Sequence, residues 1–178
     1  MPEISRAPTR TRPSLAAAAL ALALVLGACN RDENPPQSIE PTRETSCALD
    51  GMTLVDYPGP KGQIHYTKGE VDFFCDTMEM MSIYLKPEQQ KRIRAIYTQD
   101  MGTADWGKPA GHWIDARSAF FVVGGKKQGS MGPTLASFAQ QADAAAFASA
   151  QGGKVLRFDE ITPDMVRLDG GVLHDEKM

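Results

Sequence analysis

The sequence is poor in the residues and motifs that most enzymes use for chemistry. Its 178 residues include only three cysteines and three histidines. It contains no Gly-x-Ser-x-Gly, no nucleotide-binding glycine loop and no His-Glu-x-x-His. It also lacks a block of basic residues and carries a net charge of −3, which argues against nucleic acid as a partner. These absences favour a binding protein, and we predict no enzymatic activity.

Only the N-terminus carries a long apolar run, and no later segment is long and apolar enough to cross a membrane. Leu15 to Leu26 contains only Ala, Leu and Val and follows three arginines. A bilayer-spanning helix needs about 20 residues, so this shorter run is typical of a signal peptide. It ends in Leu26-Gly27-Ala28-Cys29, the pattern cut by lipoprotein signal peptidase. We therefore predict a signal peptide over residues 1–28 and lipidation of Cys29. The alternative is an ordinary signal peptide.

A polar, proline-containing stretch follows the predicted lipidation site. Pro35, Pro36 and Pro41 lie among polar residues, and Ile39 is the only aliphatic side chain between Asn30 and Glu44. Such a segment buries too little apolar surface to offset the entropy lost on ordering. We predict a flexible linker over residues 29–45, which would tether an exported domain to a membrane.

The first unit after the linker is predicted to cover residues 46–104. Its elements are predicted to be strands at 63–66 and 71–74, a helix that begins at Asp76 or Thr77 and ends before Pro87, and a strand at 93–97. The apolar side of the helix is predicted to hold Met78, Met81, Ile83, Tyr84 and Leu85. This order is strand–strand–helix–strand.

The second unit, over residues 105–165, has a similar predicted order. Trp113–Ala116 is predicted to lead into a buried strand at 119–123, followed by a helical stretch with Leu135 and Phe138. Further helical turns are predicted with Asp143 as N-cap and Phe147 on their apolar face, and they stop at Gly152-Gly153. A strand at 154–158 ends the unit. The remaining residues, 166–178, are predicted to be a disordered tail. The fold class is therefore predicted to be α+β, with two small units in tandem.

Cys47 and Met52 are the strongest candidate metal ligands. They lie on either side of an Asp50-Gly51 pair, and a turn there would direct both sulfurs toward one point. Thiolate and thioether ligands together favour Cu(I), whereas Zn(II) rarely uses methionine. In an exported protein the simplest alternative is a disulfide between Cys47 and Cys75.

Four other residues are weaker candidates for the same site. His112 follows a glycine- and proline-containing loop at the junction of the two units, so it is preferred as a third ligand. His65 lies in a predicted strand, Met131 in a loop, and Cys75 just before the first helix. For either histidine alone, an ordinary surface or core role remains the alternative. Most other methionines are interpreted as core residues.

Seven motifs in order give the chain a family resemblance. They are the lipobox at Cys29, Cys47–Met52, Tyr57–Lys61, Phe73–Asp76, Trp113–Ala116, Gly129–Pro133 and Gly152–Val155. Together they resemble the NosL family, the accessory lipoproteins of nitrous oxide reductase maturation, from Cys47 to Thr162. Related members often have a second cysteine in the first motif, where this chain has Asp50. That departure places more weight on Met52 as a ligand.

The resemblance implies a periplasmic Cu(I) chaperone. A lipid on Cys29 would attach it to a membrane, and Asn30 rather than Asp after Cys29 leaves the outer membrane open, which is preferred over the inner one. It implies delivery of copper toward the centres of nitrous oxide reductase, with the maturation ABC transporter complex or the reductase itself as partner. It also implies two α+β units similar to those of organomercurial lyase. Two alternatives stay open: a metal-free docking lipoprotein with a Cys47–Cys75 disulfide, and a thiol enzyme of lyase type.

Overall fold

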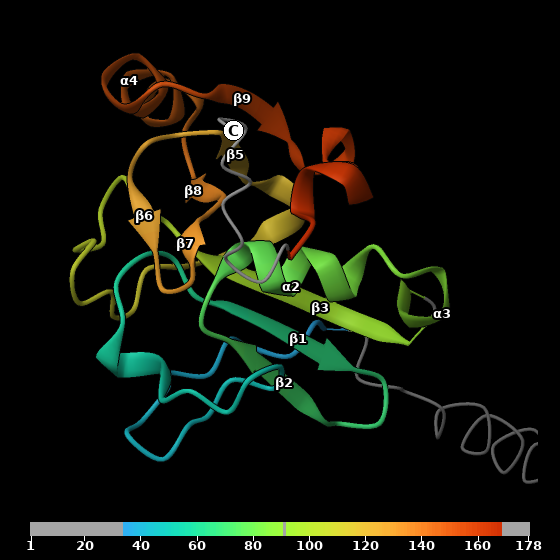
Figure 1. Ribbon diagram of the computed structural model, residues 1–178. Coiled ribbons are helices and arrows are strands. Elements are labelled where there is room, and N and C mark those ends of the chain that lie inside the picture. Colours follow the sequence, from blue (N-terminus) through green and yellow to red (C-terminus); the bar gives the residue numbers. More distant parts are fainter. Residues whose placement is uncertain (1–33, 91, 169–178) are drawn as a thin grey trace, which may run out of the picture. The chain divides into compact units, whose positions relative to one another are not determined.

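Two antiparallel sheets and one central helix organise the protein. The computed structural model describes residues 34–90 and 92–168 (Figure 1). The first sheet has the strand order β2-β1-β3-β4 and the second β8-β5-β9. The strands of the first sheet are β1 (Gly62–Tyr66), β2 (Val71–Phe74), β3 (Ile93–Gln99) and β4 (Trp113–Asp115). Those of the second are β5 (Phe120–Val123), β8 (Ala136–Phe138) and β9 (Lys154–Arg157).

The remaining elements connect or cover these sheets. The helices are α2 (Thr77–Tyr84), α3 (Pro87–Gln90) and α4 (Gln141–Gln151). A small hairpin pairs β6 (Gln128–Gly129) with β7 (Gly132–Pro133). Single 3-10 turns lie at Leu54–Asp56, Ala116–Ser118, Phe158–Glu160 and Pro163–Val166. Within the described residues no helix is long and apolar enough to span a bilayer. The predicted α+β fold class is confirmed.

Helix α2 lies against the first sheet and at the centre of the core (Figure 1). Its N-cap is Asp76, whose carboxylate accepts a hydrogen bond from the Met78 backbone N–H. Met80 and Met81 are fully buried. Met80 packs so closely over Gly62 of β1 that a methyl group there would collide with its side chain. The helix begins and ends as the sequence predicts.

The two sheets share a topology. In each, a hairpin of two strands is followed by a helix and a third strand, and the first of the three strands lies in the middle. The helix is α2 in the first sheet and α4 in the second. The predicted strand–strand–helix–strand order describes the first half with its predicted elements. In the second half the same order is formed by β5, β8, α4 and β9, and the predicted pair at 113–116 and 119–123 is not its first two strands. One hydrophobic cluster includes Ile64 and Ile96 from the first sheet and Phe121 and Leu156 from the second.

Two details of the second half differ from the prediction. The stretch with Leu135 and Phe138 is not helical, because Ala136–Phe138 forms strand β8 and pairs with Phe120–Val122. Three residues carry too little periodicity to distinguish a strand from a helix. Helix α4 begins at Gln141, after Gln140 as N-cap, so the prediction of Asp143 as N-cap is wrong. The stop at Gly152, which has a positive φ of 77°, is where the sequence predicts it.

Strand β4 crosses the predicted boundary between the units. Trp113–Asp115 pairs with β3 at Tyr97, Thr98 and Gln99, and so extends the first sheet. Buried residues of both halves also share one core. The division into units 46–104 and 105–165 stays a sequence-based prediction.

The segment Pro36–Glu40 is attached to the first sheet, which corrects the prediction of a flexible linker over residues 29–45. The backbone of Ile39 exchanges two hydrogen bonds with the Gln63 side chain, at 2.9 and 2.6 Å. The Tyr97 hydroxyl donates to the Pro36 carbonyl. The two carboxylate oxygens of Glu40 accept from the Gly111 N–H at 2.9 Å and the Trp113 indole at 2.7 Å. Polar side chains of the sheet thus supply the ordering contacts that apolar burial does not. The predicted leader, Cys29 and most of the predicted tail lie outside the described residues.

Candidate metal site

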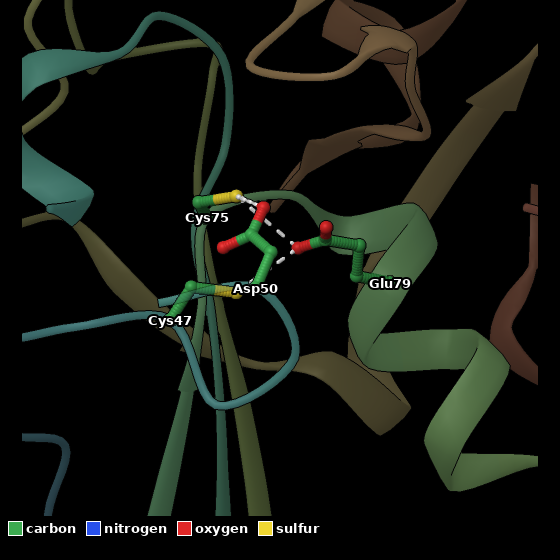
Figure 2. Close-up of side chains that lie close together, drawn as sticks. All are labelled: Cys47, Asp50, Cys75 and Glu79. Carbon is green, nitrogen blue, oxygen red and sulfur yellow. Dashed lines mark hydrogen bonds between the residues drawn. The ribbon is translucent and has the colours of Figure 1, made fainter. Parts of the chain in front are cut away.

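Four side chains meet where the turn at Cys47–Met52 lies against the end of β2 and the start of α2 (Figure 2). They are Cys47, Asp50, Cys75 and Glu79. One sulfur or oxygen from each lies within 4.8 Å of the others. Cys47, Cys75 and Glu79 are buried, and Asp50 is exposed. Two thiols and two carboxylates at this spacing form a group that can hold a metal ion.

A tight turn positions Cys47 and Asp50. The Cys47 N–H donates to the Met52 carbonyl at 2.8 Å, and the Gly51 N–H donates to the Cys47 carbonyl at 2.9 Å. The Asp50 carboxylate accepts from the Met52 N–H, and Gly51 has a positive φ of 78°, which glycine adopts without strain. The Ala48 N–H donates to the Phe73 carbonyl of β2 at 2.7 Å. This bond brings the turn against the strand that ends just before Cys75.

Glu79 joins the two cysteines. Its Oε2 atom accepts from the Cys47 thiol at 3.3 Å and from the Cys75 thiol at 3.2 Å. The Cys75 thiol also lies 3.8 Å from Asp50 Oδ2. Cys75 precedes the helix by two residues and Glu79 lies in its first turn, and the start of the helix brings the two side chains into contact. Both cysteines are free in this structure.

Burial and mutual hydrogen bonding shift the pKa values of the site. Burial raises the pKa of Glu79 to about 7, which favours the neutral acid. A hydrogen bond from Cys75 lowers the pKa of Cys47, while the same bond and burial raise the pKa of Cys75. Cys47 is therefore the first of the two thiols to ionise, and as a thiolate it accepts hydrogen bonds from its neighbours and no longer donates to Glu79.

A buried lysine lies beside the group. Lys61 is 2% exposed, and its ammonium donates to the carbonyls of Pro58 at 2.9 Å and Cys75 at 3.0 Å. Burial lowers the pKa of Lys61 to about 8, and the nearby acidic groups oppose this shift. The Ser130 hydroxyl donates to the same Cys75 carbonyl at 2.7 Å. Cys75 is thus held in place through its backbone, which leaves its sulfur for the site.

The predicted ligands fall into two sets. Cys47 and Cys75 belong to the group, and Met52 packs against the hydrophobic cluster that contains both of them. Within the described chain, neither His112 nor His65 belongs to it. The ring of His112 contacts Thr103 through Nδ1 at 2.9 Å, and that of His65 contacts Gln63 at 3.0 Å. Each assignment as a copper ligand stays a prediction.

Met131 is exposed, at 52%, in the turn between β6 and β7. Its neighbour Ser130 contacts the Cys75 backbone. The sequence analysis did not identify Asp50 or Glu79 as site residues. The signal for Glu79 was its spacing of four residues from Cys75 across a helix N-cap.

The fold and this group of donors define a small α+β protein with a candidate metal-binding site. The model of the NosL family matches residues 38–166, and the chain belongs to this family. It is 42% identical to the copper-binding lipoprotein NosL of Stutzerimonas stutzeri over 165 residues, covering 88% of this chain and 86% of the relative. It is also 42% identical to the copper-binding lipoprotein NosL of Achromobacter cycloclastes over 166 residues, covering 89% and 83%.

A solved structure shows the same fold. The crystal structure of the copper chaperone NosL from Shewanella denitrificans superposes with a TM-score of 0.71 at 40% identity. The match covers 74% of this chain and 99% of that one. The sequence-based family resemblance is therefore confirmed.

Proposed function

We propose that this chain is an exported, lipid-anchored copper-binding protein that carries Cu(I) on Cys47, Cys75 and Met52. The observation that carries the proposal is the meeting of two thiols at one buried carboxylate, with Met52 packed beside them. Two thiolates and a thioether form a soft, low-coordinate ligand set, which suits Cu(I). The printed names of the relatives, copper-binding lipoprotein and copper chaperone, support copper as the cargo.

The hydrogen bonds of the site suggest how copper enters and leaves. Cys47, whose pKa is lowered, supplies the first thiolate, and the second forms when copper displaces the Cys75 proton. Glu79 Oε2 contacts both sulfurs, so the Glu79 carboxylate, once ionised, is placed to accept that proton and to return it on release. A site with three sulfurs remains open to an incoming ligand, and copper can pass to a partner by ligand exchange.

Attachment at Pro36 limits how far the domain can move from a lipid on Cys29. The seven residue steps from Cys29 to Pro36 span at most about 24 Å when fully extended. The linker predicted over residues 29–45 would span about twice that length when fully extended. The domain would therefore work close to the membrane surface on the periplasmic side, with the outer membrane preferred on sequence grounds. Such a position suits transfer to a membrane-bound partner.

The recipient of the copper is proposed to be the maturation machinery of nitrous oxide reductase, either its ABC transporter complex or the reductase itself. To test this, the Cu(I)-loaded chain is incubated with copper-free reductase, and copper in the separated reductase is measured. We expect copper in the reductase after incubation with wild type. Chains with Cys47→Ser or Cys75→Ser should transfer none. A Cu(I) buffer set to the same free copper concentration is the control, and equal loading from that buffer would refute directed delivery.

The attached N-terminal segment gives a prediction of its own. Glu40→Gln keeps the size of the side chain but removes the charge that strengthens its bonds to Gly111 and Trp113. Loss of about 1 kcal/mol should raise amide hydrogen exchange of Gly111 and Ile39 by about fivefold. Glu44→Gln, at an exposed position four residues after Glu40, is the matched control. Unchanged exchange in Glu40→Gln would show that the carboxylate does not hold the segment.

A further inference from the structure

The site contains more oxygen donors than a Cu(I) site needs. Cu(I) is satisfied by two or three soft ligands, and carboxylates contribute little to it. Yet Glu79 is 2% exposed and lies against both thiols. In the described chain Glu79 forms no ion pair within 4.0 Å, where the printed pairs are Arg43–Asp56 and Arg167–Asp164. Burial disfavours the ionised form of Glu79 unless a cation lies beside it, and a bound cation would supply that charge.

We propose that Cys47, Asp50, Cys75 and Glu79 also form a tetrahedral site for a divalent cation of the Zn(II) class. The inference uses the cysteines of the proposed copper site, but it does not depend on copper delivery. Zn(II) takes four ligands from thiolates, imidazoles and carboxylates, and this group supplies two thiolates and two carboxylates. Met52 is not a ligand when the divalent cation is bound.

The spacing of the donors fits such a cation. With Zn–S bonds of about 2.3 Å and Zn–O bonds of about 2.1 Å, sulfur and oxygen ligands of a tetrahedron lie about 3.6 Å apart. The Glu79 oxygen lies 3.3 and 3.2 Å from the two sulfurs, and the Asp50 oxygen lies 3.8 Å from Cys75. Each value is within about 0.4 Å of the tetrahedral edge. The remaining donor pairs lie within 4.8 Å of one another, and the ion would replace the thiol protons as these donors close around it.

Charge supports the same conclusion. When ionised, the four ligands carry four negative charges, and Lys61 supplies one positive charge nearby. A divalent cation offsets twice as much of this charge as Cu(I) does. The two modes exclude each other, because both need Cys47 and Cys75. Cu(I), which prefers the thiolates more strongly, is expected to displace the divalent ion.

Co(II) tests this inference because its visible spectrum reports coordination geometry. The full chain with Cys29→Ser, which removes the one cysteine outside the site, is purified in detergent and titrated with Co(II) under anaerobic reducing conditions. We expect one Co(II) per chain, intense visible bands of tetrahedral geometry and a near-ultraviolet thiolate band. Glu79→Gln should weaken Co(II) binding by at least about tenfold.

Met52→Leu is the matched control, because it should weaken Cu(I) binding and leave the Co(II) spectrum and affinity unchanged. A pale, octahedral Co(II) spectrum without a thiolate band would overturn the inference, as would equal Co(II) affinity in Glu79→Gln and wild type. If Cu(I) still binds tightly in that case, the proposed function stands alone. If neither ion binds to wild type, both proposals fail.

Discussion

Replacement of either Cys47 or Cys75 by serine is expected to weaken Cu(I) binding by at least about a hundredfold. Loss of a residue that only orients a ligand commonly costs 10- to 100-fold in metal affinity, and a lost thiolate ligand should cost more. Both sulfurs lie within hydrogen-bond distance of the same Glu79 oxygen, so each is equally placed to bind. The measurement is competition with a Cu(I) chelator under anaerobic conditions, on full chains that carry Cys29→Ser.

Methionine and histidine variants complete this experiment. Met52→Leu should weaken binding by about tenfold, because the thioether is the softer and weaker ligand. Met78→Leu, at a partly buried methionine of the core, should change the affinity by less than about threefold. His112→Ala, His65→Ala and Met131→Leu test the remaining candidates. If Cys75→Ser binds as tightly as wild type while His112→Ala does not, the ligand set is Cys47, Met52 and His112, as the sequence analysis preferred.

The local part of the site was predictable from the sequence. An Asp-Gly pair between Cys47 and Met52 indicates a turn, and the structure has one, closed by a hydrogen bond from the Cys47 N–H to the Met52 carbonyl. The approach of Cys75 was not predictable in this way. It depends on the bond from Ala48 to Phe73, which joins two segments that are distant in the sequence. Local spacing carries no information on such a contact.

The fold shows the same division between local and distant information. Helix α2 is capped by Asp76 and ends before Pro87, and both signals lie within the segment itself. Strand β8 is three residues long and exists because it pairs with β5. The attachment of Pro36–Glu40 likewise depends on side chains of other elements, such as Gln63 and Trp113. Neither feature leaves a periodic pattern in its own residues.

Metal-free protein is expected to lose stability as the pH rises from about 4.5 to 7, and Glu79→Gln should remove a large part of that loss. The pKa of Glu79 is raised from 4.5 to about 7 by burial. Across this window the unfolded chain loses the Glu79 proton while the folded chain keeps it, so the free energy of unfolding falls with pH. At 1.36 kcal/mol per pKa unit, the Glu79 contribution is about 3 kcal/mol. The stabilising contribution of the neutral Glu79 is lost completely only above pH 7.

Chemical denaturation of the metal-free chain at pH 5 and pH 7, with a chelator and reductant, measures this effect. Wild type should lose more stability between these two values than Glu79→Gln does. A residual fall should persist, because burial also raises the pKa of Asp76 to about 6. Glu70→Gln, at an exposed carboxylate in the β1–β2 turn, controls for the loss of one charge and should behave as wild type. If Glu79→Gln and wild type lose the same free energy of unfolding between pH 5 and pH 7, Glu79 is ionised in the folded protein throughout this range. The two thiols would then face a permanent negative charge, and Glu79 could accept the proton that copper displaces at every pH in this range.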